Sequence, residues 1–258
     1  MVVPNPLRRP FFGKLRTSVL KRRYRLMRAI APLLSREPIP IRCRYFGARF
    51  KVNPGDLIGD GIAINRIEWR EITMMIAACR EYRPDLLIDV GANIGLYSCI
   101  VGRARLVPRV VAFEPDQRNF ARLNDNVERN RLTDIVQTRP HAVGATAGTV
   151  RLSPGPPENT GLSKIDNTAI DGYEVSVIKL DDAFDIQKRS IAVKIDVEGA
   201  ELQVLEGAAN LFSRNFGYAQ IEGHGDARAS EITQLMQTYG WQFIDRHGLD
   251  LRFQRRIQ

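Results

Sequence analysis

The chain has 258 residues, of which 44% are hydrophobic, and it carries a formal charge of +9. This length suits one α/β domain with a short extension and argues against two full domains. The three cysteines, Cys43, Cys79 and Cys99, form no CxxC pair and no Cys/His cluster with zinc spacing. They indicate free thiols in a reducing compartment rather than a disulfide framework.

The positive charge is concentrated at the N-terminus. Residues 1–36 contain ten of the 38 Lys and Arg residues and no Asp or Glu, so 28 basic residues face 29 acidic ones in the remainder. The body of the protein is therefore nearly neutral. This distribution removes the main support for a globally basic nucleic-acid-binding domain.

Residues 1–40 are predicted to form a basic arm that is partly an amphipathic helix. Within it, apolar residues recur at helical steps at Leu15, Val19, Leu26, Ile30 and Leu33. Such a helix can pack its apolar stripe on its own domain, contact an anionic membrane surface through residues 11–34, bind nucleic acid or act as an organellar address. No apolar run approaches the roughly 18 residues of a membrane span, and arginines interrupt any signal-peptide core.

Residues 41–258 are predicted to form a single α/β domain. Two short strands around Gly47 come first, within residues 41–54, and a helix over residues 65–82 follows. Buried strands and helices then alternate, and the chain closes with a hairpin over residues 241–254. The strands are expected at residues 86–90, 109–115, 191–197 and 216–222, with a shorter one near residue 136. This alternation predicts a mostly parallel sheet with helices on both faces and the ligand at the carboxyl ends of the strands.

The loop after the first buried strand contains two glycines, Gly91 and Gly95, with Asn93 between them. The spacing does not match a dinucleotide fingerprint, and no Gly-Lys-Ser/Thr of a Walker loop follows. Asp89 precedes the loop, where its charge would repel a pyrophosphate. A carboxylate here favours a ligand with an ammonium group and no phosphate, such as S-adenosylmethionine (SAM). Glu114, about 20 residues further on, ends the next strand, where an acid accepts hydrogen bonds from ribose hydroxyls.

Four segments resemble the FkbM family of SAM-dependent methyltransferases: "LLIDVGANIGLYS", "VVAFEPDQRNFARLNDNVERN", "IKLDD" and "AVKIDVEGAELQVLEGA". The resemblance spans about residues 45–225, with the SAM-binding core at about 84–225. It implies a class I, Rossmann-like methyltransferase fold, in which a seven-stranded, mostly parallel sheet has one antiparallel strand. It also implies O-methylation of hydroxyls, commonly on sugars or polyketide-type molecules.

Carried over to this sequence, the resemblance assigns SAM binding to the glycine loop and to the acid of the second strand. The residues concerned are Asp89, Gly91, Ala92, Asn93, Gly95 and Glu114. Where the family often has an A-L-G-D segment, this chain has Ala142-Val143-Gly144-Ala145, without the acid. We therefore expect the adenine to contact the backbone at Ala142 or the side chain of His141.

Candidate catalytic residues follow the last two parallel strands. Lys194, Asp196 and Glu198 share one strand face by the period of two; Asp196 is assigned to the site floor beside the cofactor methyl and acceptor hydroxyl. Glu198 is expected to bind the acceptor or cap a helix. The alternative is a lysine–acid network that only anchors the next helix. No metal is assigned, because two carboxylates alone are weak support for Mg²⁺.

His224 is the first choice for general base, because an imidazole is competent near neutral pH. It lies on the same face as Glu222, although Gly223 between them makes its local geometry uncertain. The alternative interpretation of His224 is an exposed loop histidine. His247 is interpreted as a solvated turn residue.

These patterns predict a SAM-dependent O-methyltransferase acting on a hydroxyl of a saccharide, glycolipid or secondary metabolite. The Asn/Asp-Pro-Pro-aromatic tetrad of nucleobase N-methyltransferases is replaced by "DVEGAE", which disfavours nucleic acid as acceptor. Residues 144–174 are expected to shape the acceptor pocket. The alternatives are an RNA methyltransferase that uses the basic arm and a non-catalytic SAM-binding module. We expect a cytoplasmic protein, peripheral at the inner face of a membrane if the arm binds lipid; the sequence leaves the oligomeric state open.

Overall fold

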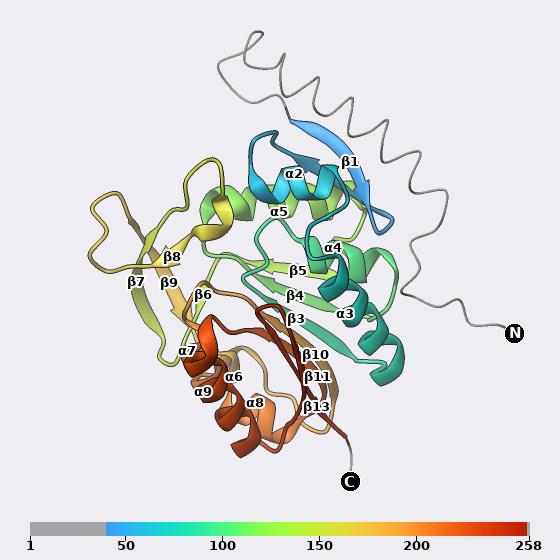
Figure 1. Cartoon of the computed structure of the whole chain (residues 1–258), viewed down its shortest axis with the longest axis vertical. Coiled ribbons are helices and arrows are strands. Elements are labelled where there is room, and N and C mark those ends of the chain that lie inside the picture. Colours follow the sequence, from blue (N-terminus) through green and yellow to red (C-terminus); the bar gives the residue numbers. More distant parts are fainter. Residues whose placement is uncertain (1–39, 257–258) are drawn as a thin grey trace, which may run out of the picture.

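The computed structural model describes residues 40–256, and its centre is a seven-stranded sheet (Figure 1). In the order of the sheet, the strands are β12 (Gln242–His247), β13 (Asp250–Arg255), β11 (Phe216–Glu222), β10 (Ser190–Ile195), β3 (Leu86–Val90), β4 (Val110–Phe113) and β5 (Val136–Arg139). Only β13, among these strands, runs antiparallel to its neighbours. The predicted class I methyltransferase fold, mostly parallel with one antiparallel strand, is confirmed.

Two apolar cores lie on opposite faces of this sheet. The strands β3 and β10 are buried along their whole length, which explains why they read as continuous apolar runs. Leu87 joins one core, whereas Leu86 and Ile88 join the other. The first core is covered by α3 (Trp69–Tyr82), α4 (Leu96–Arg103) and α5 (Gln117–Arg129). The second is covered by α6 (Leu180–Ala183), α7 (Glu201–Glu206), α8 (Ala209–Arg214) and α9 (Gly225–Thr238).

Two predicted helices differ in their extent. The helix expected from residue 65 begins only at Trp69, because Asn65 and Glu68 adopt left-handed backbone conformations (φ 56° and 42°). The helix expected after β10 is divided into α7 and α8 at Gly207. A Cβ atom at Gly207 would lie 2.0 Å from the carbonyl oxygen of Gly144. Because the backbones at Gly207 and Gly144 pack this closely, only glycine fits at the break between the two helices.

Residues 142–178, which include the segment expected to shape the acceptor pocket, form a second, four-stranded sheet. Its strands and short 3-10 helix are β6 (Ala142–Val143), β7 (Gly148–Ser153), η1 (Thr160–Leu162), β8 (Lys164–Ile165) and β9 (Tyr173–Ile178), in the sheet order β6-β9-β7-β8. It is fastened to the start of α5, since Asp116 Oδ2 accepts a hydrogen bond from Ser163 Oγ at 2.7 Å. Arg118 also donates to the carbonyl of Gly155 at 2.9 Å.

An N-terminal unit packs on the other side of α5. It consists of the antiparallel pair β1 (Ile41–Tyr45) and β2 (Ala48–Val52), followed by α2 (Leu57–Ala63). Asn126 and Asn130 of α5 bind the free edge of β2. Asn126 Oδ1 accepts from Lys51 N, and Asn130 accepts from Arg49 N and donates to Arg49 O. Two asparagines one helical turn apart therefore take the place of a further strand.

The predicted basic arm lies outside the described residues, so its predicted helix and surface contacts are not addressed by the structure. Among residues 40–256, no helix combines the length and apolar character needed to cross a membrane.

Removing the Asn130 amide tests this attachment. We expect Asn130→Ala to lower the free energy of unfolding by about 1–3 kcal/mol, because it leaves the part-buried Arg49 N–H and C=O groups without their hydrogen-bond partner. Asn167→Ala, at an exposed site with one backbone contact, should stay within about 0.5 kcal/mol of the wild type. Urea unfolding of the three proteins measures the difference; equal stability of the two variants would contradict the role given to Asn130.

Candidate functional site

The glycine loop joins β3 to α4 and lies directly against the end of β10. Gly91 and Gly95 have φ values of +79° and +85°, and Asn93 has +51°. A Cβ atom at Gly91 would lie 1.8 Å from the carbonyl oxygen of Asp196. Only glycine permits this approach, which brings the loop into contact with the chain that carries Asp196.

Asp89, at the end of β3, is buried and fixes the first turn of α4. Its Oδ2 accepts hydrogen bonds from Ser98 N (3.1 Å) and Ser98 Oγ (2.5 Å). Burial raises the pKa of Asp89 to about 6, against the opposing effect of these bonds. The side chain also forms part of a cavity wall. One carboxylate oxygen therefore has a structural role that the sequence analysis did not foresee.

Glu114, at the end of β4, ties the glycine loop to the start of α5. Its Oε2 accepts from Asn93 N at 2.7 Å, and its Oε1 accepts from Asp116 N at 2.8 Å. Burial raises the pKa of Glu114 to about 8 in spite of these two donors. Near neutral pH the carboxyl group can thus both accept a hydrogen bond from a hydroxyl and donate one.

These residues surround a cavity of about 240 Å³, here called the first cavity. The predicted cofactor residues Asp89, Gly91, Ala92, Asn93, Glu114, His141, Ala142 and Asp196 line it. Gly95 instead packs on α5, where a Cβ would meet Leu123 at 2.6 Å. Two buried polar atoms of the wall, Asn119 Oδ1 and His141 Nδ1, have no hydrogen-bond partner among the described residues. These two atoms suit a ligand with polar edges. Asn119 was not identified from the sequence.

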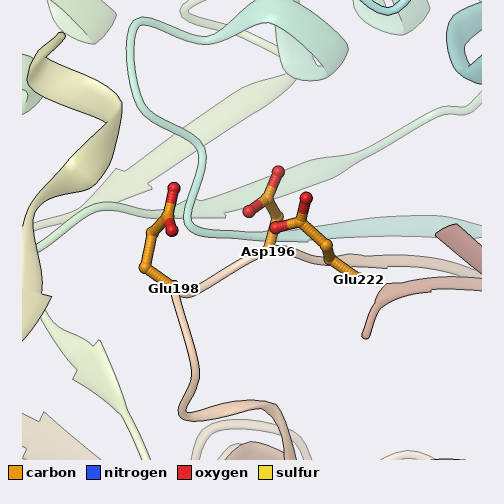
Figure 2. A group of neighbouring side chains, drawn as sticks. All are labelled: Asp196, Glu198 and Glu222. Atoms are coloured by element: carbon orange, nitrogen blue, oxygen red, sulfur yellow. The ribbon is translucent and has the colours of Figure 1, made fainter. Parts of the chain in front are cut away.

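Three carboxylates meet at the ends of β10 and β11 (Figure 2). Asp196, Glu198 and Glu222 each offer an oxygen atom, and these atoms lie within 4.8 Å of one another. Burial and a hydrogen bond to Asp196 raise the pKa of Glu222 to about 10. Burial opposes ionisation of Asp196 as well, but Lys194 and the Glu222 hydrogen bond hold its pKa below the ordinary value. Asp196 is therefore the charged member of the pair and Glu222 carries the proton.

Lys194 lies beneath this cluster, almost fully buried. Its Nζ is 2.8 Å from Asp250 Oδ1 and 3.5 Å from Asp196 Oδ2. Burial disfavours its charged form, yet the neighbouring carboxylates raise the pKa of Lys194 well above the ordinary value. The lysine–acid network considered above thus exists, but it joins β10 to β13 rather than to the next helix.

Glu198 lies in the loop after β10 with a left-handed backbone (φ 54°) and does not cap a helix. Glu201 Oε1 instead accepts from the backbone N–H groups of Val197 (3.4 Å) and Gly199 (3.0 Å). The side chain of Glu198 is left to line the first cavity. Of its two predicted roles, only acceptor binding is compatible with this position.

The histidines take three different positions. His224 precedes α9, its side chain 47% exposed, with Nε2 3.3 Å from Glu222 Oε2 and 4.0 Å from Glu198 Oε2. It therefore contacts the carboxylates from outside the cavity walls. His141 is in the first cavity. His247 is not a solvated turn residue: it is partly buried, and its Nε2 is 3.6 Å from Glu71 Oε1.

A second cavity of about 490 Å³ adjoins the first, and Glu68, Lys194, Asp196 and Glu222 line both. Burial raises the pKa of Glu68 to about 7. The remaining wall consists of Arg66, Trp69, Arg70, Glu71, Leu249 and Asp250. Sequence reasoning missed Glu68 and Asp250. For Glu68, the charge-dense segment "NRIEWRE" before a helix was a signal in the sequence. Asp250 had no local signal, because it reaches the site through its pairing with Glu222 across β11 and β13.

The raised carboxyl pKa of Glu222 makes stability depend on pH. A folded-state pKa above the unfolded value of 4.5 gives stability that is present at low pH and lost as the pH rises toward about 10. The protein should therefore lose stability over roughly pH 5 to 9, and Glu222→Gln should flatten this profile. Glu128→Gln, at an exposed position of α5, is the control. Urea unfolding across the pH series measures both; an unchanged slope in Glu222→Gln would contradict the assignment.

Comparisons with known proteins show the family of the chain. The sequence model of the Methyltransferase FkbM domain matches residues 89–243. Hexuronic acid methyltransferase AglP of Haloferax volcanii is 29% identical over 202 residues, which cover 78% of this chain and 80% of that protein. The 31-O-demethyl-FK506 methyltransferase FkbM of Streptomyces tacrolimicus is 29% identical over 201 residues, covering 64% and 75%.

Among solved structures, the methyltransferase FkbM of Methylobacillus flagellatus KT matches with a TM-score of 0.50 and 20% identity. The match covers 67% of this chain and 44% of that chain, so this protein spans less than half of it. This likeness supports the fold alone. Because the family's sequence model matches more than half of the chain, the protein belongs to the FkbM family of methyltransferases.

Proposed function

We propose that this protein is a SAM-dependent O-methyltransferase that acts on a hydroxyl of a saccharide, glycolipid or secondary metabolite. The observation that carries the proposal is the wall that the two cavities share. A donor in the first cavity and an acceptor in the second would meet at Asp196 and Glu222. Two relatives, a hexuronic acid methyltransferase and a 31-O-demethyl-FK506 methyltransferase, support an oxygen acceptor of these classes.

The first cavity has the groups that SAM requires. Glu114 would hold the ribose hydroxyls, and the unpartnered Asn119 Oδ1 and His141 Nδ1 would receive the polar edge of the adenine. The carboxylate of Asp89 would attract the ammonium group. When bound, SAM supplies a methyl group that is already activated as a sulfonium, so the protein needs mainly to align the acceptor oxygen.

The acceptor hydroxyl must also lose its proton. Asp196, charged at neutral pH and exposed to both cavities, would accept the hydrogen bond of that hydroxyl and orient its oxygen. As Asp196 takes the proton, Glu222 can pass its own to His224 Nε2, which lies 3.3 Å away. His224 then releases it to solvent. Asp196 and His224 thus share the general-base role that the sequence analysis gave to His224.

Two further expectations remain proposals. Residues 11–34 would give a cytoplasmic protein peripheral contact with an anionic membrane, an idea that rests on their basic and apolar sequence. RNA is disfavoured as acceptor, because the chain outside the arm carries nearly equal numbers of acidic and basic residues.

Gly91 tests the cofactor site. We expect Gly91→Ala to abolish detectable binding of S-adenosylhomocysteine, because the new Cβ must displace the Asp196 carbonyl or the loop. It should also destabilise the fold by about 1–3 kcal/mol from overpacking, beyond the ~1–2 kcal/mol of a left-handed alanine. Gly47→Ala has a similar φ of +86° and no neighbour within 4 Å. It should therefore show only the cost of a left-handed alanine and bind S-adenosylhomocysteine normally. Calorimetric titration and urea unfolding measure both effects; unimpaired binding in Gly91→Ala would place the cofactor elsewhere.

The reaction itself is tested with methyl-labelled SAM. The protein is incubated with a host extract that is then split into glycolipid, small-molecule, RNA and protein fractions. We expect label in the glycolipid or small-molecule fraction and a rate about 10²–10⁴ lower in Asp196→Asn, with S-adenosylhomocysteine affinity retained. Label in RNA would overturn the acceptor class. Cofactor binding without label in any fraction would favour the non-catalytic module.

A further inference from the structure

We propose that the second cavity is an acceptor subsite for an anionic saccharide, in which Arg66 and Arg70 bind a carboxylate or phosphate and Trp69 stacks on the sugar ring. This inference rests on the proposed function and specifies its acceptor. It begins from position: the cavity holds about 490 Å³, opens beside the first cavity and includes Asp196 and Glu222 in its wall. A molecule bound here would have a hydroxyl within reach of these carboxylates.

The two arginines are exposed. Within residues 40–256, no ion pair joins the guanidinium of Arg66 or Arg70 to a carboxylate. Two arginines on the neighbouring strands behave differently, since Arg246 pairs with Asp226 and Arg252 with Asp245. Arginine presents a planar fork of donors that matches carboxylate and phosphate oxygens. The guanidinium groups of Arg66 and Arg70 therefore suit an anionic ligand.

The cavity also contains acids, and most of them have a basic neighbour or a raised carboxyl pKa. Lys194 lies between Asp196 and Asp250, and Glu71 contacts His247 at 3.6 Å. Glu222 and Glu68 have raised carboxyl pKa values, which keep Glu222 protonated and Glu68 partly so near neutral pH. Most of the acids on the floor are thus paired or protonated, whereas neither arginine at the rim has an ion pair within residues 40–256.

The N-terminus of helix α3 adds positive potential to the cavity. Trp69, Arg70 and Glu71 form its first turn and all line the cavity. The preceding Glu68 has a left-handed backbone, and its side chain does not cap the helix. The positive end of a 14-residue helix therefore faces the cavity. Trp69 contributes a broad apolar ring with a polar edge, the kind of surface that can pack on the C–H face of a pyranose.

The test uses the full chain saturated with S-adenosylhomocysteine. Glucuronic acid, glucose 6-phosphate and glucose are titrated by calorimetry, and Trp69 fluorescence gives a second readout because Trp241 is buried. We expect at least one anionic sugar to bind roughly tenfold more tightly than glucose. The double variant Arg66→Ala/Arg70→Ala should remove this preference. The control Arg103→Ala, at the far end of α4, should keep it.

The two anionic probes distinguish a carboxylate from a phosphate as the recognised group. Equal binding of glucose, failure of all three sugars to bind in the millimolar range, or an unchanged preference in the double variant would overturn the inference. A failure of the anionic subsite and a failure of the proposed function give different results. Label from SAM in a neutral metabolite, with the same KM in the double variant, would leave methyl transfer in place and remove the anionic subsite. Anionic sugar binding without any labelled fraction would instead refute the transferase activity.

Discussion

The close approach of the Gly91 backbone to the carbonyl of Asp196 is the constraint on which the site depends. It holds the loop after β3 against the chain leaving β10, with 1.8 Å between that oxygen and the place where a side chain would begin. The same contact places the carboxylate cluster in the wall of the first cavity, beside the loop. The proposed cofactor site and the proposed proton acceptor Asp196 are therefore neighbours in the fold as it stands.

The site concentrates acidic groups in a buried region, and the fold meets the electrostatic cost in three ways. Asp89 and Glu114 are bound by N–H or O–H donors of the loops that they position. Asp196 is paired with a buried lysine, and Glu222 retains its proton. A buried charge is tolerated only when it is paired or neutralised. The protonation pattern that leaves Asp196 charged and Glu222 neutral therefore also lowers the cost of burying the cluster.

The sequence predicted those features that arise from local patterns. Continuous apolar runs identified β3 and β10, the glycine spacing identified the loop, and strand-end acids identified Glu114 and Asp196. It failed where distant segments meet. Asp250 reaches the site through antiparallel register, and the break at Gly207 depends on a backbone 63 positions away in sequence. In the second sheet, β6, β7 and β8 were not predicted, because β6 and β8 have two residues each and β7 is only partly buried, so they give little periodic signal.

The features that were predicted well and those that were predicted poorly lie in different parts of the site. The elements predicted from sequence, β3, β4 and β10 with their loops, surround the first cavity. The start of α3, which was placed too early, and the strands within residues 144–174 supply the outer walls. Loops and appended segments tolerate change because their packing is less constrained than that of the sheet. This division agrees with the proposal that Arg66, Trp69 and Arg70 select the acceptor, at the junction where the N-terminal unit meets the strand ends.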